Sequence, residues 1–424
     1  MYLTKEDERM LSGEYGGLVQ EAMRFLVKLG DAYDAERMID IKYSYAYLFS
    51  REWGKGALNV ELLEEAAKSG VKVKVPTINW NYGLEVISSR AQKEAQVPPD
   101  LFKSVKKDAE LCRKFGMIAV DTCAPFLVDP MERFPLGMHI SSIESGAIVY
   151  YNTVWGLRTN REGLSAFLSA ITGKYPEFGY HLDENRIGKY LFNVEVELKN
   201  HADYSLLGFY IGKIVGDEVP VITGIRNPGI EDLKAITCSM AVGGSVTLAH
   251  IVGITPEART LDMAFGKEKP KDKITVTLKE LESTREELAD GKEGEEVNFI
   301  ELGCPHCTIH EIAKIAKLLE GKKIKEGVKL HVQTAPAIAY LAKINGYTDI
   351  IENAGGTIMS ICPVLNPGIP GPRYCHSHPE YTVGNLASNS TKAIFYGPSN
   401  TNCKKRFLGT TEQCIKAGLT GKWG

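Results

Sequence analysis

Three cysteines in this chain stand where chemistry is expected, because each follows a short β-like run of residues. Cys123, Cys304 and Cys362 come after segments rich in apolar and β-branched residues. In open α/β proteins, ligands and cofactors gather at the carboxyl ends of strands. Three thiolates from three such ends can hold an iron–sulfur cluster and leave one iron without a protein ligand. That iron would act as a Lewis acid, so the pattern predicts metal-assisted chemistry.

The motif Cys304-Pro-His306-Cys307 also permits two other interpretations. A pair of cysteines at this spacing, between a strand and a helix, is typical of a thiol–disulfide oxidoreductase, because a helix amino terminus lowers a thiol pKa. The same motif also suits half of a zinc site, with His306 or His310 as further ligands. The sequence contains no second pair of this kind, and the chain is much longer than a thioredoxin-like domain. Both interpretations stay open as weaker alternatives.

The other cysteines carry less information. Those inside expected helices are interpreted as small buried apolar residues, and those in expected loops stay unassigned. The first group is Cys112, Cys238, Cys307 and Cys414, and the second group is Cys375 and Cys403.

Polar residues are concentrated between the first of these cysteines and residue 163. Arg158 and Arg161 have a spacing at which both can bind a carboxylate or a phosphate through two hydrogen bonds each, and a solvated loop explains two arginines equally well. Lys392 lies in a segment with several hydroxyl side chains and is a second candidate for binding an anion. His250 lies in an apolar segment, so we expect it to be a hydrogen-bonded core residue.

The elements that must position these residues alternate between strand and helix patterns. Such alternation indicates parallel sheets covered by helices, an α/β fold. From residue 297 onward the sequence predicts a strand, a helix at 308–319, a strand at 328–332, a helix at 336–343 and a strand at 357–361.

The domain organisation follows from the same patterns and from charge. A chain of 424 residues is longer than a single core usually serves. Residues 1–270 are expected to form an α/β region of two lobes that carries the first cysteine. Residues 271–296 are strongly charged and are interpreted as a connection with one strand, and residues 297–424 as a C-terminal α/β domain. At the amino terminus, a helix capped by Thr4 is expected to continue towards Leu29.

Composition and charge argue against several classes of protein. A hydrophobic content of 44% is ordinary for a globular protein, and a net charge of −3 favours neither nucleic acid nor an acidic membrane surface. No apolar run approaches the roughly 20 residues of a membrane span, and the amino terminus is unlike a signal peptide. The nine cysteines are irregularly spread, which suits a reducing compartment. We therefore expect a cytoplasmic protein with no nucleic-acid or membrane partner.

Several of these segments together resemble the aconitase X family, and the resemblance extends over the whole chain. Its most specific parts are residues 159–163 and Cys304-Pro-His306, whereas Cys307 is not part of the family pattern. The motifs that carry the resemblance are Asp121-Thr-Cys123-Ala-Pro, His139-Ile, Glu144-Ser145, Tyr151-Asn152-Thr153, Gly156-Leu-Arg158-Thr159-Asn160-Arg161-Glu162-Gly163, His250-Ile-Val-Gly-Ile-Thr255-Pro256-Glu257-Ala258, Gly303-Cys304-Pro-His306, Cys362 and the region of Lys392.

The resemblance implies an aconitase-like α/β fold, in which several lobes with helix-covered sheets surround an iron–sulfur cluster. The family's members are hydro-lyases, and a swivelling domain closes over their cluster. We expect that domain on a separate small subunit here, as in the two-chain archaeal type, because the chain has no room for it. Cys123, Cys304 and Cys362 are expected to bind the cluster, a [4Fe-4S] centre with one iron that lacks a protein ligand.

The resemblance also implies roles for the polar residues. His139 and His306 are the candidates for the acid that protonates the departing hydroxyl. The base in aconitases is a serine of the swivelling domain, so we expect it on the small subunit. The residues expected to bind the substrate's carboxylate and phosphate are Ser142, Glu144, Asn152, Arg158, Asn160, Arg161 and Lys392.

The implied reaction is the dehydration of (R)-mevalonate 5-phosphate to trans-anhydromevalonate 5-phosphate, in an archaeal mevalonate pathway for isoprenoid biosynthesis. The family's other activity, dehydration of cis-3-hydroxy-L-proline, needs a site for an amine as well as a carboxylate and stays an alternative. A thiol–disulfide oxidoreductase and a regulatory iron–sulfur sensor are the alternatives from other classes.

Overall fold

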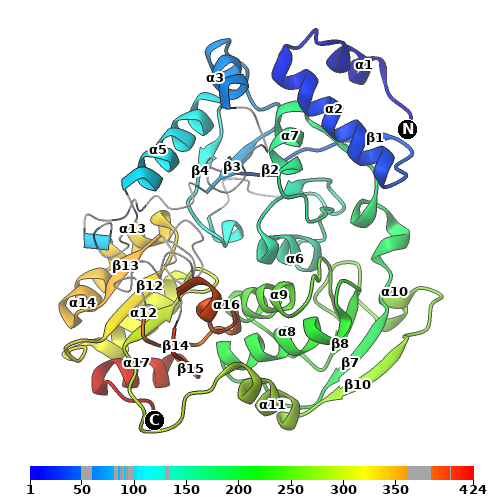
Figure 1. The fold of residues 1–424 in the computed structure, drawn as a ribbon. Coiled ribbons are helices and arrows are strands. Elements are labelled where there is room, and N and C mark those ends of the chain that lie inside the picture. The colour runs from blue at the N-terminus through cyan, green and yellow to red at the C-terminus, as the bar shows by residue number, and fades with distance from the viewer. Residues whose placement is uncertain are drawn as a thin grey trace.

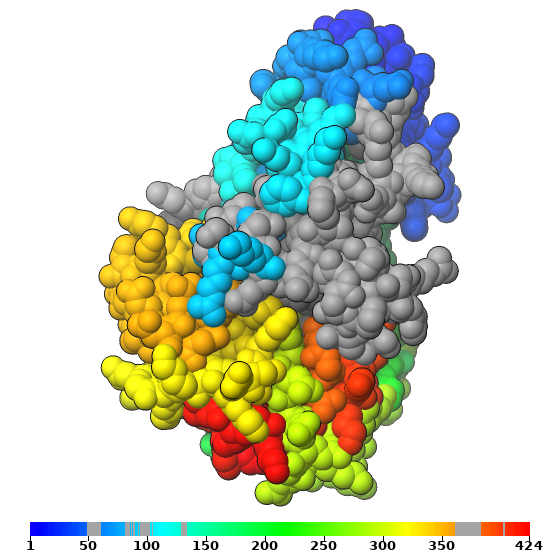
Figure 2. Space-filling view, turned by 60° about the vertical axis from the view of Figure 1, so that its left-hand side comes forward, coloured from blue at the N-terminus to red at the C-terminus, as the bar shows by residue number. Residues whose placement is uncertain are grey.

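The computed structural model arranges the chain in three α/β regions, each built on a parallel sheet (Figure 1). Figure 2 shows the blue and cyan amino-terminal residues at the upper end and the yellow to red carboxy-terminal residues in the lower part. No helix in the part that the structure describes is both long and apolar enough to cross a membrane. The structure describes residues 1–48, 60–80, 85, 87, 90–91, 93, 99–128, 134–360, 383–401 and 403–424.

The first region contains a four-stranded parallel sheet with the order β4-β3-β2-β5. A separate antiparallel pair joins β1 and β6. The strands are β1 (Met38–Asp40), β2 (Ser44–Tyr45), β3 (Thr77–Asn79), β4 (Ile118–Ala119), β5 (Ser141–Ser142) and β6 (Lys174–Pro176). The helices are α1 (Lys5–Ser12), α2 (Gly17–Ala32), α3 (Val60–Lys68), α5 (Pro99–Lys114), α6 (Ser145–Thr153) and α7 (Ser165–Thr172).

The first helix has the predicted cap but not the predicted length. The Asp7 carboxylate accepts from the Thr4 backbone N–H at 2.8 Å, and the Thr4 hydroxyl accepts from the Asp7 N–H at 3.3 Å. The prediction of one helix towards Leu29 is wrong, because the helix ends after α1 and a second helix, α2, begins after a short turn. Gly13 and Gly16 have φ angles of 92° and 93° there, a left-handed conformation that glycine adopts at little cost and that ends a helix.

The second region has a parallel sheet with the order β10-β7-β8-β9. The segment 271–296, interpreted above as a connection, instead supplies the edge strand β10 and the helix α11 to this region. Most side chains of β10 are exposed, so its sequence lacks the apolar pattern of a central strand. The elements are β7 (Tyr190–Val194), α8 (His201–Val215), β8 (Pro220–Thr223), α9 (Ile230–Gly243), β9 (His250–Ile251), α10 (Leu261–Phe265), β10 (Asp272–Val276) and α11 (Leu278–Leu288).

Helix α9 is held close to α8 by glycines. A Cβ atom at Gly208 would lie 2.3 Å from the carbonyl oxygen of Ile236, and one at Gly243 would lie 2.2 Å from that of Phe209. Any larger residue at either position would push the two helices apart. The stretch of α9 from residue 233 to residue 242 is buried throughout, and the helix lies beside α6 near the middle of the molecule (Figure 1).

The third region has a five-stranded parallel sheet with the order β13-β12-β11-β14-β15. The five predicted elements all occur in the predicted order, as β11, α12, β12, α13 and β13, and the structure adds one helix that was not predicted, α14, between α13 and β13. The parallel sheet with its helices confirms the α/β fold class. The elements are β11 (Phe299–Leu302), α12 (Ile309–Leu319), β12 (Lys329–Gln333), α13 (Pro336–Ile344), α14 (Tyr347–Ala354), β13 (Thr357–Met359), β14 (Asn385–Ser388), α16 (Thr391–Thr401), β15 (Lys405–Leu408) and α17 (Thr411–Thr420).

Candidate active site

Two of the three predicted cysteines lie where the first and third regions meet. Cys123 follows β4, and Cys304 follows β11 after Gly303, whose φ of 109° turns the chain away from the strand. The backbone N–H of His306 donates to the sulfur of Cys123 at 3.4 Å, so the Cys304 loop lies against Cys123. Cys362 lies outside the described residues, as does Cys375. Their positions stay predictions.

The environment of Cys123 is electrostatically mixed. Burial raises the pKa of this thiol to about 12, and the negative charge of Glu144 adds to the effect. The ammonium of Lys392 and the N–H of His306 act in the opposite direction. A thiol in such a place becomes a thiolate when a metal replaces its proton. Among the described residues, no three His, Cys, Asp or Glu side chains are arranged to hold a metal ion, and this part of the chain includes two of the three predicted ligands.

Cys238, which the sequence analysis interpreted only as a buried apolar residue, contacts this site. It is buried on α9 and shares a side-chain hydrogen bond with Cys304. This bond lowers the pKa of Cys238 against the effect of burial, and the positive charges of Lys392 and Lys234 lower it further. The residue is therefore more than core packing, although no sequence signal distinguished it from the other helical cysteines.

The second cysteine of the Cys304 motif is not poised for redox chemistry. Cys307 is 3% exposed, and burial together with the negative charge of Glu311 raises its pKa. A reactive cysteine needs a lowered pKa and access to its substrate. Cys304 is itself only 2% exposed. The structure therefore gives no support to the thiol–disulfide oxidoreductase alternative.

A charged pair lies beside the cysteines. The Lys392 ammonium, at the start of α16, is 3.1 Å from a carboxylate oxygen of Glu144, which caps α6. Burial alone would lower the pKa of Lys392, but the negative charges of Glu144 and of three cysteines raise it well above its ordinary value. Those cysteines are Cys123, Cys238 and Cys304. Arg161 is an exposed residue whose guanidinium donates to the backbone oxygen of Ala241 at 3.4 Å, and its charge also interacts with the Glu144 carboxylate. The structure thus brings three of the predicted substrate-binding residues together.

His306 is fully buried beside Cys123. Its Nδ1 atom is 2.9 Å from the Thr122 hydroxyl, and its ring packs edge-on against Trp80. Its Nε2 atom has no hydrogen-bond partner among the described residues. Burial lowers the pKa of His306 to about 3, and the positive charges of Lys234 and Lys392 contribute. The ring is therefore neutral near pH 7.

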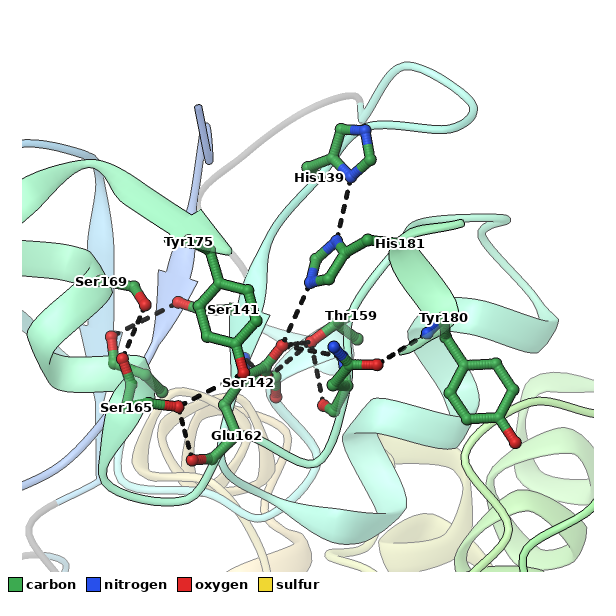
Figure 3. A network of polar contacts seen from close by, with 12 residues as sticks. His139, Ser141, Ser142, Thr159, Glu162, Ser165, Ser169, Tyr175, Tyr180 and His181 are labelled. Atoms are coloured by element: carbon green, nitrogen blue, oxygen red, sulfur yellow. Dashed lines mark hydrogen bonds and ion pairs between the residues drawn. The ribbon is translucent and has the colours of Figure 1, made fainter. Parts of the chain in front are cut away.

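His139 lies in a different cluster of polar residues, shown in Figure 3. Its Nδ1 is 2.9 Å from Nδ1 of the buried His181, whose Nε2 is 3.6 Å from the Glu162 carboxylate. Burial raises the pKa of Glu162 to about 8, although N–H and hydroxyl donors around it oppose the shift. One donor is the backbone N–H of Ser142, at 2.6 Å, while the Ser142 hydroxyl is buried and has no partner among the described residues. Among the described residues, the contacts of His139 include neither Cys123 nor Cys304.

Three other predicted substrate-binding residues have structural partners. Arg158 bonds the Asp183 carboxylate and donates to the backbone oxygen of His181 at 2.9 Å. The fully buried Asn152 donates from its side-chain amide to three backbone oxygens, one of them at residue 247, between α9 and β9. Asn160 accepts from the N–H of residue 180 at 2.7 Å. His250 is buried as predicted, and its Nε2 is 2.6 Å from a backbone oxygen.

Three family models match successive parts of the chain. They describe an aconitase X first domain, second domain and third domain, and they match residues 1–184, 188–286 and 297–420. The chain belongs to the aconitase X family. The resemblance stated from the motifs is thereby confirmed. In the family's terms, Cys123 lies in the first domain, Cys238 in the second and Cys304 in the third.

Curated relatives of this aconitase X protein are dehydratases. The phosphomevalonate dehydratase large subunit of Methanothermobacter thermautotrophicus is 38% identical over 87% of this chain and 89% of its own length. The corresponding large subunit of Thermococcus kodakarensis is 36% identical over 93% and 95%. The cis-3-hydroxy-L-proline dehydratase of Pseudomonas aeruginosa is 29% identical over 98% of this chain and 70% of its own length. The chain is therefore a dehydratase, which is a hydro-lyase.

A solved structure confirms the aconitase-like fold. The crystal structure of aconitase X from Thermococcus kodakaraensis, in its holo-form, is 34% identical and has a TM-score of 0.82. The match covers 99% of this chain and 100% of that one.

Sequence reasoning missed several residues of the site. Lys234 is a fully buried lysine on α9, and Thr122 fixes the ring of His306. A lysine near the start of the mostly apolar stretch 233–242 was a usable signal, because a charged residue is rarely buried without a partner. His181 gave no comparable signal, since its partners His139 and Glu162 come from separate parts of the chain. Glu162 stood within the motif 159–163, whose Thr159 and Asn160 donate to its carboxylate.

Proposed function

We propose that this chain is the large subunit of a phosphomevalonate dehydratase, which removes water from (R)-mevalonate 5-phosphate to form trans-anhydromevalonate 5-phosphate in a mevalonate pathway. Support comes from the relatives of that name at 36% and 38% identity, compared with 29% for the hydroxyproline dehydratase. The words "large subunit" in those names support a small subunit as partner, which we assign as the swivelling part of the enzyme.

The observation that carries the proposal is the position of the Lys392–Glu144 pair beside Cys123 and the Cys304 loop. A cation next to soft sulfur ligands is what an anionic substrate of a metal-dependent hydro-lyase requires. Arg161, whose charge also interacts with Glu144, supplies a second cation. The two cations are proposed to hold the carboxylate and the phosphate of the substrate, while Glu144 keeps the ammonium of Lys392 in place.

The cysteines fit an iron–sulfur cluster, which we propose to be a [4Fe-4S] centre held by Cys123, Cys304 and Cys362. Thiolates are the usual ligands of such clusters. The sulfur of Cys123 already accepts a backbone N–H, an interaction that is common at cluster sulfurs and tunes their potential. When bound, the cluster would supply a Lewis-acidic iron for the substrate hydroxyl.

His306 is the better placed of the two predicted acids. The Thr122 hydroxyl oxygen accepts from the backbone N–H of Ala124 at 3.1 Å, so we assign its proton to Nδ1 of His306. The ring proton of the neutral imidazole then sits on Nε2, the atom without a described partner. We propose that Nε2–H donates a hydrogen bond to the departing hydroxyl, because a neutral imidazole keeps its ring proton near pH 7. For His139 we propose only an indirect role through His181, and the base is assigned to the small subunit.

The test is an anaerobic assay of the large subunit with and without its small subunit. Both (R)-mevalonate 5-phosphate and cis-3-hydroxy-L-proline are offered, and loss of water is followed by mass spectrometry. We expect the enzyme to convert (R)-mevalonate 5-phosphate and not cis-3-hydroxy-L-proline, and to do so only when both subunits are present. Turnover of hydroxyproline, or cluster assembly without turnover of either compound, would reject the proposed activity.

A further inference from the structure

A fully buried lysine of the second domain lies against the loop that carries Cys304. The ammonium of Lys234 is 3.0 Å from the carbonyl oxygen of Pro305, 2.9 Å from that of His306 and 2.7 Å from a carboxylate oxygen of Glu311. An ammonium has three N–H donors, and all three are used here. Burying a charge is costly unless it is paired and hydrogen-bonded, so this geometry is strongly specified.

The first of these contacts acts on the peptide unit that faces Cys123. The carbonyl of Pro305 and the N–H of His306 belong to one peptide group, and in a planar trans peptide they point in opposite directions. Lys234 holds the oxygen on one side, and the N–H on the other side donates to the sulfur of Cys123. The orientation of this single peptide therefore depends on Lys234.

The carboxylate partner of Lys234 is anchored independently. Glu311 lies in the first turn of α12, where its carboxylate accepts from the backbone N–H of Thr308 at 2.9 Å in a capping box. Nδ1 of His201, at the start of α8, is 3.4 Å from the other carboxylate oxygen. Lys234 thus connects α9 to a fixed point on α12 as well as to the loop between β11 and α12.

A second side chain of α9 contacts the same loop. Cys238 follows Lys234 by four residues, so the two side chains share one face of the helix. Cys238 hydrogen-bonds Cys304, and Lys234 binds the two carbonyls directly after Cys304. The second domain, which contributes none of the predicted ligands, therefore contacts the Cys304 loop at two points.

We propose that Lys234 is a positioning residue of the cysteine site: it orients the Pro305–His306 peptide so that its N–H points at the sulfur of Cys123, and it fixes the Cys304 loop against the first domain. The part of this inference that concerns iron rests on the proposed function. The part that concerns the loop does not, so the two can fail separately.

The test uses a paired substitution that leaves no buried charge alone. Lys234→Met and Glu311→Gln are combined, because removing both partners of a buried pair costs far less than removing one. Gln at position 311 also keeps the capping box of α12. The control is Lys174→Met combined with Asp40→Asn, which removes another buried lysine together with its partner at 2.8 Å, in the first domain away from the cysteines. Glu6 and Asp7, the other carboxylates near Lys174, stay in place.

Two readouts are taken on the full chain with its small subunit. The first is the rate at which iodoacetamide alkylates Cys123 and Cys304 in the metal-free protein, mapped by mass spectrometry. The second is the rate of iron loss to a chelator, with the midpoint potential of the reconstituted protein. Removing an outer-shell partner of metal ligands typically weakens metal binding by about 10- to 100-fold.

In the paired variant we expect alkylation and iron loss to be at least about tenfold faster and the potential to be lower, with both rates unchanged in the control. Unchanged alkylation in the paired variant overturns the inference, whether or not iron binds. A wild type that takes up no iron while the alkylation difference persists rejects the proposed cluster and keeps the positioning role.

Discussion

The ammonium of Lys392 lies 3.1 Å from the carboxylate of Glu144, although the two residues are 248 positions apart in the chain. Lys392 is the second residue of α16 in the third domain, and Glu144 caps α6 in the first. The pair therefore joins two domains at the place where Cys123 and the Cys304 loop meet. It defines the candidate site more sharply than the cysteines alone.

Removing the ammonium should impair the reaction strongly. In Lys392→Met we expect kcat/KM for mevalonate 5-phosphate to fall by about ten- to hundredfold, because a hydrogen bond to a charged group contributes about 1.5–3 kcal/mol. Lys314→Met is the control, since Lys314 forms an exposed pair with Glu412 at 2.8 Å. Steady-state kinetics of the two variants measure the difference. Equal activities would remove Lys392 from the substrate site.

The two arginines of the 156–163 motif should behave differently. The charge of Arg161 interacts with Glu144, and its guanidinium makes one long bond, of 3.4 Å, to the backbone oxygen of Ala241. Arg161→Gln should therefore raise KM about tenfold or more and lower the free energy of unfolding by less than about 1 kcal/mol. Arg158 bonds Asp183 and a backbone oxygen, so Arg158→Gln should lower stability by about 1–2 kcal/mol and leave KM unchanged. Steady-state kinetics measure KM for both variants, and thermal unfolding measures their stability. The reverse pattern would return Arg158 to the substrate site.

Glu162 should make stability depend on pH. Its pKa is raised by burial from an ordinary value of 4.5 to about 8, so the folded state favours the protonated carboxyl. Its stabilising contribution is complete below pH 4.5 and is lost as the pH rises towards 8. Relative to Glu162→Gln, the wild type should lose about 1–3 kcal/mol between pH 5 and pH 8.

Urea unfolding at several pH values measures how the free energy of unfolding changes with pH. The comparison is between the pH dependence of the wild type and that of Glu162→Gln, not between their absolute stabilities. His181 and Tyr175 are the titratable groups that face Glu162, and burial shifts both pKa values away from this range. A difference between wild type and variant that is flat with pH would contradict the raised pKa.

Cys307 should be dispensable for activity. It is buried in the core of the third domain, so Cys307→Ala should cost about 1 kcal/mol of stability and keep full dehydratase activity. Cys304→Ala, three residues earlier, should lose activity completely. A variant at position 307 that loses turnover while it stays folded would revive the redox interpretation.

Much of the fold could be predicted because its elements follow strong local signals. The strand–helix alternation after residue 297 and the capping box at Thr4 are such signals. The edge strand β10 was harder, because an exposed strand has no apolar pattern. The end of the first helix at Gly13 was also hard to predict, because the helical pattern continues along the sequence and the left-handed conformation of this glycine is seen only in the structure.

The site was predictable only in part, for a related reason. The strand-end rule indicated that Cys123 and Cys304 belong together, and the structure places the Cys304 loop against Cys123. Lys234 and Cys238 reach the site from the side of a buried helix, not from a strand end. Their roles depend on the close packing of α9 against α8, which no spacing of residues along the chain reveals.

The most direct test of the account is the content of iron and acid-labile sulfide in protein purified without oxygen. The wild type is measured beside Cys123→Ser, Cys304→Ser and Cys362→Ser, with Cys414→Ser as a control for a buried cysteine elsewhere in the third domain. The account predicts about four irons and four sulfides per chain in the wild type and the control. It predicts a lost or depleted cluster in each of the three variants. Zinc or no metal in the wild type, or a cluster that survives all three substitutions, would contradict it.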